Sequence, residues 1–530
     1  MLFIALLAII LPLLFIVVLR QSVRRSMTMS ALIVGASAWW AWGMQPIAIW
    51  ASLWQALHRS LTIGLILYGA ITLVKTLQTT GAFSRIKQGF YAISPDMRVQ
   101  TVLVAFAFVS LIEGASGFGT PAIVAAPLLI ILGFTPLAAA TLALLGDTVA
   151  VTFGAVGTPL LVGLENVPQY SPQLATLVGI QATMFDVIIG TLLPVGLIAV
   201  LVFGFGTQTA RTKWHSLLAI TPWALTMGLV YSLSAFVAVR LVGPEFTSIA
   251  AGALTLAIGM ITAKRRIGIP AATWRHHTQE PQPQPQLDHQ LPLWKAWLPY
   301  GIVIGLLLLT RTIPAIKHAA HSLLDASWQT IWGVEGISSS WPILYSPGLI
   351  LLIAAFGAAF IIARSARPLV TPLKEALSAT VKALLALVPT LILVQLFSNS
   401  GHNTSGLAAM PVFIGHTLAE LFHGAWLAVA PLLGALGAFI AGSATVSTLT
   451  LGPVQASIAD TAGLPLVSVL ALHMIGAAAG NIIAIHNVVA ASTVVGLHGR
   501  EGQIIRRLIV PTLVYLAIAS LIGLVWYWLQ

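Results

Sequence analysis

The sequence predicts an all-α polytopic membrane protein with about twelve transmembrane helices plus two re-entrant hairpins. Of its 530 residues, 58% are hydrophobic and only 7% are charged, whereas a soluble domain carries roughly 25% charged residues. Runs of about 18 or more apolar residues recur, which is the length that crosses about 30 Å of hydrocarbon as a helix. Since lipid offers backbone amides no hydrogen-bond partner, and the alternating pattern of a membrane barrel is absent, each crossing should be helical.

The composition excludes several classes of protein. The chain has no cysteine, so neither a disulfide framework nor a thiolate metal site is available. A net charge of +11 would indicate nucleic acid binding in a soluble protein. Here the Lys and Arg residues punctuate apolar runs, as cytoplasmic loops require, so lipid is the expected environment and no nucleic acid partner or cofactor is predicted. Residues 2–19 lack a basic leader and a cleavage site, which favours a retained first helix over a signal peptide.

The basic loops predict the topology. Arg20, Arg24 and Arg25 follow the first helix and place that loop in the cytoplasm and the N-terminus outside. The next apolar runs cover 29–56 and 60–82. Assigning all later basic clusters to the cytoplasm gives a consistent path only if residues 99–133 and 424–453 enter and leave on the same side, as re-entrant hairpins, with both termini outside.

The chain divides at one obvious linker, which contains HHTQEPQPQPQLDHQ. This segment is polar and rich in Pro and Gln, so we expect a flexible cytoplasmic connection. Its residues His276, His277 and His289 could instead bind a metal, but their setting favours the linker, and no metal site is predicted. The predicted parts are N-terminal helices at 1–59, a first repeat at 60–266, the linker at 267–294, connecting helices with an external loop at 295–375, and a second repeat at 376–530.

The two halves are expected to be inverted relative to each other. The helix at 60–82 runs from outside to inside and precedes a Gly/Ser-rich break at 113–120. The helix at about 376–398 runs from inside to outside and precedes a second break at 442–453. Inverted repeats with interrupted helices in matching positions indicate a transport site near the middle of the bilayer.

The first segment that carries chemistry is EGASGFGTP, from Glu113 to Pro121. Its glycines and Thr-Pro step break the helix, and unwound backbone is tolerated in a membrane only where it lines a cavity. The half-helix that follows would present free amide donors to an anion. We therefore predict substrate contacts at Ser116, Gly117, Gly119 and Thr120. The alternative is close helix packing through small residues.

The second segment, GDTVAVTFGAVGTP, repeats this design with Asp147 and a Gly-Thr-Pro break at Thr158. An ionised carboxyl in the bilayer costs several kcal/mol, so each acid should face a cavity, find a partner or stay protonated. Glu113 and Asp147 are the predicted proton-coupling residues, and Asp186, in a less interrupted helix, ranks third. A neutral acid that serves packing alone is the alternative.

The second half offers three polar segments among apolar sequence. Gly442 to Pro453 reads as a hairpin tip of hydroxyls suited to a carboxylate and a 2-hydroxyl, although small polar residues also hold helices together. A histidine beside the last glycine-rich break can titrate near neutral pH, although a buried histidine more often satisfies a local hydrogen bond. The predicted substrate-binding residues here are Asn399, Ser400, Ser443, Thr445, Ser447, Asn481 and His486.

At these segments the sequence resembles the bacterial L-lactate permease family, which includes glycolate permeases. Family members have an E-G-A-A-G-F-G-x-P run and then N-T-x-P-V-A-F-G-A-x-G-x-P, to which residues 113–121 and 147–159 are similar. Gly243-Pro244-Glu245 and the tail from Ala490 to Glu501 fit as well. The resemblance implies an inverted-repeat fold of the ion-transporter type and a multi-pass inner-membrane permease that imports 2-hydroxymonocarboxylates, such as L-lactate, D-lactate or glycolate, by proton symport.

The sequence departs from that family pattern at functional positions. Ala444 stands where family members usually have an acid, Asn481 where they commonly have Lys, and Asp147 where Asn is typical; 484–487 is Ala-Ile-His-Asn instead of Ser-Pro-Gln-Ser. A sodium-coupled transporter of another organic anion therefore stays open as an alternative, since unwound carbonyls and hydroxyls also hold sodium. An enzyme is not expected, because no H-E-x-x-H, nucleophile elbow or phosphate loop is present.

Overall fold

The computed structural model describes residues 1–117, 119–275, 291–422 and 425–529. Within these ranges the regular structure is helical, with isolated β-bridges. Eight helices of the described residues are long and apolar enough to cross a membrane, or nine with the pair Arg367–Leu385 and Leu387–Ser398, which is bent by 41°. The predicted all-α polytopic class is thereby confirmed. The linker motif around His276, His277 and His289 lies outside the described residues.

The helices fall into two runs along the chain, on either side of the linker. The first run is α1 (Leu2–Leu13), α2 (Val23–Trp40), α3 (Pro46–Thr79), α4 (Ala82–Ile93), α5 (Met97–Gln100), α6 (Val109–Ser116), α7 (Thr120–Ile131), α8 (Pro136–Gly146), α9 (Thr148–Val151), α10 (Gly154–Leu161), α11 (Pro172–Phe205), α12 (Ala210–Leu241) and α13 (Thr247–Lys264). The second run is α14 (Leu293–Thr312), α15 (Pro314–Ser322), α16 (Pro347–Ala363), α17 (Val370–Ser398), α18 (Met410–Phe422), α19 (Trp426–Ala441), α20 (Ala444–Thr461), α21 (Leu466–Ile483), α22 (Ile485–Val494) and α23 (Glu501–Leu529).

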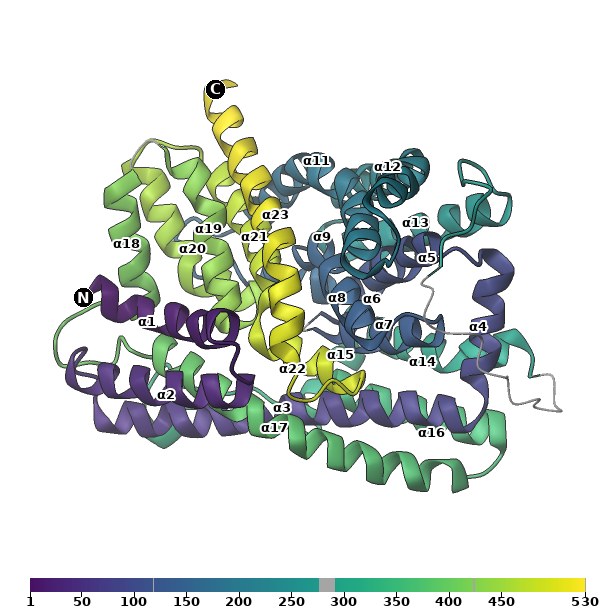
Figure 1. The fold of residues 1–530 in the computed structure, drawn as a ribbon. Helices are drawn as coiled ribbons and strands as arrows, with labels where there is room; N and C mark the ends of the chain where they lie inside the picture. Colours follow the sequence, from purple (N-terminus) through teal and green to yellow (C-terminus); the bar gives the residue numbers. More distant parts are fainter. Residues whose placement is uncertain (118, 276–290, 423–424, 530) are drawn as a thin grey trace.

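A layer of long helices supports the rest of the molecule. Helix α3 packs along α16 and α17, and α17 packs along α2. In Figure 1 these helices run side by side along the lower edge. Above them lie a group from the first run, α6 to α13, and a group from the second run, α18 to α23, which meet where α11 packs on α21.

Helix α3 is longer than the sequence pattern predicts. The two apolar runs at 29–56 and 60–82 are divided at residues 41–45 instead of 57–59, because Gly43 adopts a left-handed φ of 70° and Pro46 opens the next helix. The predicted boundary between residues 59 and 60 therefore falls inside α3. As a result Arg59 lies not in a loop but within α3, which is long and apolar enough to cross a membrane.

Part of the order of elements recurs in both runs. In the first run a long helix (α3) precedes a helix–break–helix (α6–α7), a second broken unit (α8 to α10) and another long helix (α11). In the second run α17 precedes α19–α20, α21–α22 and α23 in the same order. Broken helices at matching positions are what the repeat interpretation expects.

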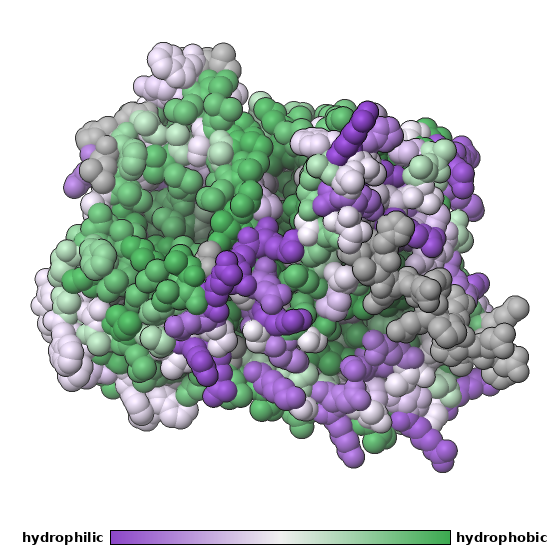
Figure 2. Space-filling view, in the orientation of Figure 1, coloured by the Kyte–Doolittle hydropathy of each residue, from purple (hydrophilic) through white to green (hydrophobic). Residues whose placement is uncertain are grey.

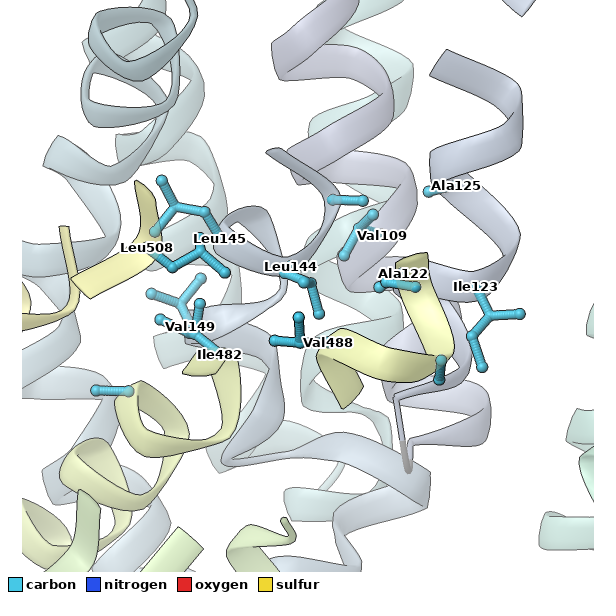
Figure 3. Close-up of a cluster of buried hydrophobic side chains, with 14 of the residues drawn as sticks. Val109, Ala122, Ile123, Ala125, Leu144, Leu145, Val149, Ile482, Val488 and Leu508 are labelled. Atoms are coloured by element: carbon cyan, nitrogen blue, oxygen red, sulfur yellow. The ribbon is translucent and has the colours of Figure 1, made fainter. Parts of the chain in front are cut away.

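The two groups share a packed apolar interior. Helix α22 packs against α7 and α8, and α21 packs against α9. Figure 3 shows Val488 of α22 pointing toward Leu144 of α8, next to Ala122 of α7. Small residues permit the closest approaches: a Cβ added at Gly434 of α19 would collide with the backbone carbonyl of His473 in α21. The broken helices are therefore held by tight packing.

The outer surface is strongly apolar. Figure 2 shows hydrophobic residues spread over α1, α18, α19 and the upper part of α23. On α23, Val510, Leu513 and Leu521 are 59–65% exposed. Exposed aliphatic side chains in such numbers are unfavourable in water and favourable in lipid.

A buried ion pair fixes the chain beside the linker. Asp96 caps α5 and accepts three hydrogen bonds from the Arg98 guanidinium, the shortest 2.6 Å long, and one from the Trp274 N–H. Arg98 also donates to the carbonyls of Ser216 and Ala272. Since both charged side chains are at most 3% exposed, their mutual satisfaction is a condition for this arrangement.

Candidate functional site

Four helix breaks meet at one place between the two groups of helices. Gly117 follows α6 with φ 61°, and Gly442 follows α19 with φ 65°. Inside α10, the backbone from Ala155 to Gly157 is left-handed, and α21 is separated from α22 by Ala484. Two of these breaks rest on glycine because the conformation is costly for other residues. The segments around Glu113, Thr158, Ser443 and Asn481 are therefore brought together, whereas the segment with Asn399 and Ser400 is not among them.

The breaks border a small cavity of about 20 Å³, which we call the Glu113 cavity. It draws residues from both runs of helices. Its lining consists of Glu113, Gly117, Val151, Gly154, Ala155, Pro159, Gly442, Ser443, Ala444, Thr445 and Asn481.

Glu113 is the acid of this cavity. Its side chain is 3% exposed, and its Oε1 atom lies directly against the Cα of Gly154, where a Cβ would collide with it. Its Oε2 atom has no hydrogen-bond partner among the described residues. A buried carboxyl with an unsatisfied oxygen beside a cavity is poised to bind a proton or a cation.

Asp147 lies next to this acid. It stands between α8 and α9, is 4% exposed, and is close enough to Glu113 for their charges to interact. Its Oδ1 atom also lacks a partner among the described residues. Two like charges in a site of low polarity repel strongly, so a proton shared between them stabilises the pair.

The second run of helices supplies polar groups to the opposite wall. Ser443 caps α20 by accepting a hydrogen bond from the Val446 N–H at 3.4 Å. Asn487 donates to the backbone and side-chain oxygens of Asn481 at 3.0 and 2.9 Å. A Cβ at Gly119 would press on Asn487 Oδ1, so the α6–α7 and α21–α22 breaks touch each other.

Arg59 is the residue that sequence reasoning missed. The His486 ring packs against the backbone of Gly442, and the Arg59 charge lies within interaction range of that ring. Arg59 is half-buried and has no ion-pair partner within the described part of the chain. The sequence does show a single Arg between two apolar runs. Because the predicted boundary between two helices was placed at residue 59, Arg59 was assigned to a loop and was not considered as a site residue.

Asp186 lies in a second polar cluster. Tyr515 of α23 donates a hydrogen bond to Asp186 Oδ1 at 3.3 Å. Tyr231 of α12 is close to both Asp186 and Asp147 and shares a 3.4 Å hydrogen bond with Ser248. The cluster borders a very small cavity of about 10 Å³, lined in part by Asp186 and Tyr231. Asp186 thus lies near Asp147 through Tyr231, which is close to both acids, and it does not line the Glu113 cavity.

Other predicted residues lie away from the Glu113 cavity. Ser447 donates to the carbonyl of Gly434, and Ser400 donates to the carbonyl of Phe397. The amide of Asn399 donates to Ser52 and Gln55 of α3. Each of these three side chains is engaged by neighbouring protein groups.

The remaining predicted residues of the first run have separate positions. Thr158 donates to the carbonyl of Ala155 and faces a different cavity. Thr120 is fully buried beside Gly119. The side chain of Ser116 lies outside the described part of the chain.

In the described ranges, no three His, Cys, Asp or Glu side chains gather in a group that could hold a metal ion. Glu113 is the one charged residue in the lining of the Glu113 cavity among the described residues, with Asp147 beside it and the Arg59 charge near the His486 ring.

Comparison with known proteins decides the family. The sequence model of a family described as L-lactate permease matches residues 2–529, which is nearly the whole chain. The chain belongs to the L-lactate permease family. The resemblance expected from residues 113–121 and 147–159 is thereby confirmed. An L-lactate permease of Bacillus subtilis is 27% identical over 513 residues, covering 90% of this chain and 86% of the relative.

Further relatives agree with this membership. A protein of Haemophilus influenzae whose name includes L-lactate permease is 31% identical over 482 residues, covering 86% of this chain and 85% of the relative. The glycolate permease of Escherichia coli is 25% identical over 497 residues, covering 87% and 83%. As a member of the L-lactate permease family, the chain is a multi-pass bacterial membrane transporter and not an enzyme.

Proposed function

We propose that this L-lactate permease homologue is a secondary active transporter that carries small 2-hydroxymonocarboxylates, such as L-lactate, D-lactate or glycolate, together with protons. The observation that carries the proposal is the meeting of four helix breaks around the Glu113 cavity. Unwound backbone inside a membrane protein is stable only in protein or beside a water-filled cavity. The names of the relatives, L-lactate permease and glycolate permease, supply the substrate class.

The cavity offers suitable partners for a hydroxy acid. Ser443 and Thr445 stand at the start of α20, where free backbone N–H groups and the helix dipole favour a carboxylate. The amide of Asn481 can accept from or donate to a 2-hydroxyl. Arg59, behind His486, adds the positive charge that an anion needs in a site of low polarity.

Glu113 and Asp147 are the proposed proton carriers. Their unpartnered oxygens and their proximity support the binding of one proton by the pair. Tyr231 connects Asp147 with Asp186 and Tyr515, which supports a route for the proton toward α11 and α23. Proton loss from the pair would restore the repulsion, so release of the proton and of the substrate should be linked.

The proposed topology keeps about twelve crossings and two re-entrant hairpins, with both termini outside and the halves inverted. The hairpins correspond to residues 99–133 and 424–453, each of which contains a helix, a break at Gly117 or Gly442, and a second helix. The matched order of elements in the two runs supports this arrangement. Cysteine-accessibility labelling is straightforward because the chain has no native cysteine.

The test is uptake of radiolabelled L-lactate and glycolate into proteoliposomes. One pH unit is worth 1.36 kcal/mol per proton, so an inwardly directed gradient of one unit should give about tenfold accumulation at one proton per substrate. Glu113→Gln should remove accumulation while retaining exchange of internal for external lactate. If the wild type accumulates lactate to the same level with and without the pH gradient, proton coupling is refuted.

Sodium coupling is the second candidate, because carboxylate oxygens without partners at Glu113 and Asp147 also suit a hard cation. Replacing sodium with choline at a fixed pH gradient separates the two. Loss of accumulation in choline would transfer the coupling role to sodium, and unchanged accumulation would exclude it.

A further inference from the structure

A third cavity shares Ala155, at the α10 break, with the Glu113 cavity. Its volume is about 430 Å³, and we call it the Arg311 cavity. It is bordered by the end of α14, by α15, by the turn that contains Tyr345, and by α10. The lining residues are Ala155, Val156, Thr158, Leu161, Val162, Val242, Glu245, Phe246, Arg311, Thr312, Lys317 and Tyr345.

Arg311 is built into this cavity with an unused donor. The residue is 6% exposed, its Nη2 donates to the Tyr345 carbonyl at 2.9 Å, and its Cζ lies 3.3 Å from the centre of the Tyr345 ring. The Nη1 atom has no hydrogen-bond partner among the described residues. An arginine whose position is fixed on two sides and whose third side borders a cavity is preorganised to bind an oxygen anion.

The surrounding charges favour a single negative charge. Lys317 and Arg311 are positive, Glu245 is negative, and none of the three forms an ion pair within the described ranges. The two positive charges also act on a neighbouring histidine. The pKa of His321 is lowered, first by burial and then by the charges of Arg311 and Lys317. The cavity therefore carries one net positive charge, which matches a monocarboxylate.

A strained segment separates the two cavities. Ala155 lines both of them. Ala155 and Val156 have φ values of 46° and 57°, which are sterically costly for residues other than glycine and most costly for a β-branched side chain. A strained backbone persists only where the surrounding residues hold it in place. We therefore expect the segment with Ala155 and Val156 to be the part that moves when a substrate passes from one cavity to the other.

We propose that the Arg311 cavity is a second carboxylate site, in which Arg311 binds the monocarboxylate before or after it occupies the Glu113 cavity. This proposal rests on the proposed function for the identity of its ligand, and on the proposed topology for its external position. No residue of this second site was among those predicted from the sequence except Thr158.

The test compares Arg311→Gln with Arg240→Gln. Arg240 is a matched control, because it also ends a helix, donates to a backbone carbonyl and stacks on an aromatic ring, that of Phe236, but does not line the cavity. In L-lactate uptake, Arg311→Gln should raise KM at least tenfold with kcat within twofold of the wild type. Arg311→Lys keeps the positive charge but loses the planar guanidinium with its paired N–H donors, so its KM should lie between those of the wild type and Arg311→Gln. Glu245→Gln removes a negative charge from the cavity and should lower KM.

Equilibrium binding of radiolabelled L-lactate to the purified full chain gives an independent readout. The wild type should bind two molecules per chain, and Arg311→Gln should bind one while eluting as the same monodisperse species. A KM change no larger than that of Arg240→Gln, or a binding ratio unchanged by Arg311→Gln, would overturn the second site. Uptake that is absent from the wild type, with two binding sites retained, would refute the proposed function and leave the Arg311 site standing.

Discussion

Gly442 offers the sharpest test of the site geometry. Alanine at this position meets two obstacles: the left-handed φ of 65°, and the His486 ring, which occupies the space of a Cβ. Holding alanine in the left-handed backbone conformation costs about 1–2 kcal/mol of stability. Displacing a packed ring adds about 1–3 kcal/mol. Gly442→Ala should therefore lower the free energy of unfolding by about 2–5 kcal/mol.

Gly463 is the matched control, because its φ is 64° and no heavy atom of the described residues lies within 4 Å of an added Cβ. Gly463→Ala should cost only the backbone term, about 1–2 kcal/mol. The assay is reversible unfolding in mixed micelles, followed by tryptophan fluorescence. Lactate uptake should fall in Gly442→Ala and persist in Gly463→Ala, since Gly442 directly precedes the residue that caps α20.

A double-mutant cycle isolates the ring. If His486 causes the extra cost, Gly442→Ala in a His486→Ala background should cost no more than Gly463→Ala, which gives a coupling energy of about 1–3 kcal/mol. Additive effects of the two substitutions would refute the packing of His486 against the α19–α20 break, and with it the placement of Arg59 near the site.

Three further predictions concern charged residues. Arg98→Gln should lower the free energy of unfolding by about 3–5 kcal/mol, since it leaves the buried charge of Asp96 without its partner; Lys75→Gln, which breaks an exposed pair with Glu375, should cost at most about 1 kcal/mol in the same denaturation assay. Arg59→Gln should raise the KM for lactate uptake, whereas His58→Gln should not. Asp147→Asn should weaken the dependence of uptake on the pH gradient, and a gradient dependence equal to that of the wild type would contradict the role assigned to Asp147.

Composition and local pattern were sufficient for the fold class and for the breaks. The breaks at Gly117 and Gly442 were readable because glycine beside Ser, Thr and Pro interrupts a helix even where the surrounding sequence is apolar. The helix boundary at 41–45 was not readable, since apolar sequence continues through it and only the turn at Gly43 decides where α3 begins. Boundaries between adjoining apolar helices depend on packing, which composition does not record.

Site membership was harder to predict than site location. Asn399 and Ser447 have polar side chains that could bind a hydroxy acid. In the structure, however, the Asn399 amide donates to Gln55 and the Ser447 hydroxyl donates to the Gly434 carbonyl. Arg311 gave no signal in the sequence, because a basic residue near a helix end normally faces water or lipid headgroups. Its burial on Tyr345 follows from the fold of residues 313–347 and becomes visible only in three dimensions.

The departures from the family pattern gain a physical sense from the placement of Arg59. The usual acid at position 444 is alanine and the usual lysine at position 481 is asparagine, while Asp147 adds an acid in the first run of helices. Arg59 supplies a cation from the layer of long helices, close to His486. Glu113 and Asp147 thus lie in the broken helices of the first run, whereas Arg59 lies in α3, a helix that packs on α16 and α17. An anion held by both would connect that layer to the broken helices, so the strength of substrate binding should depend on how the two parts are positioned.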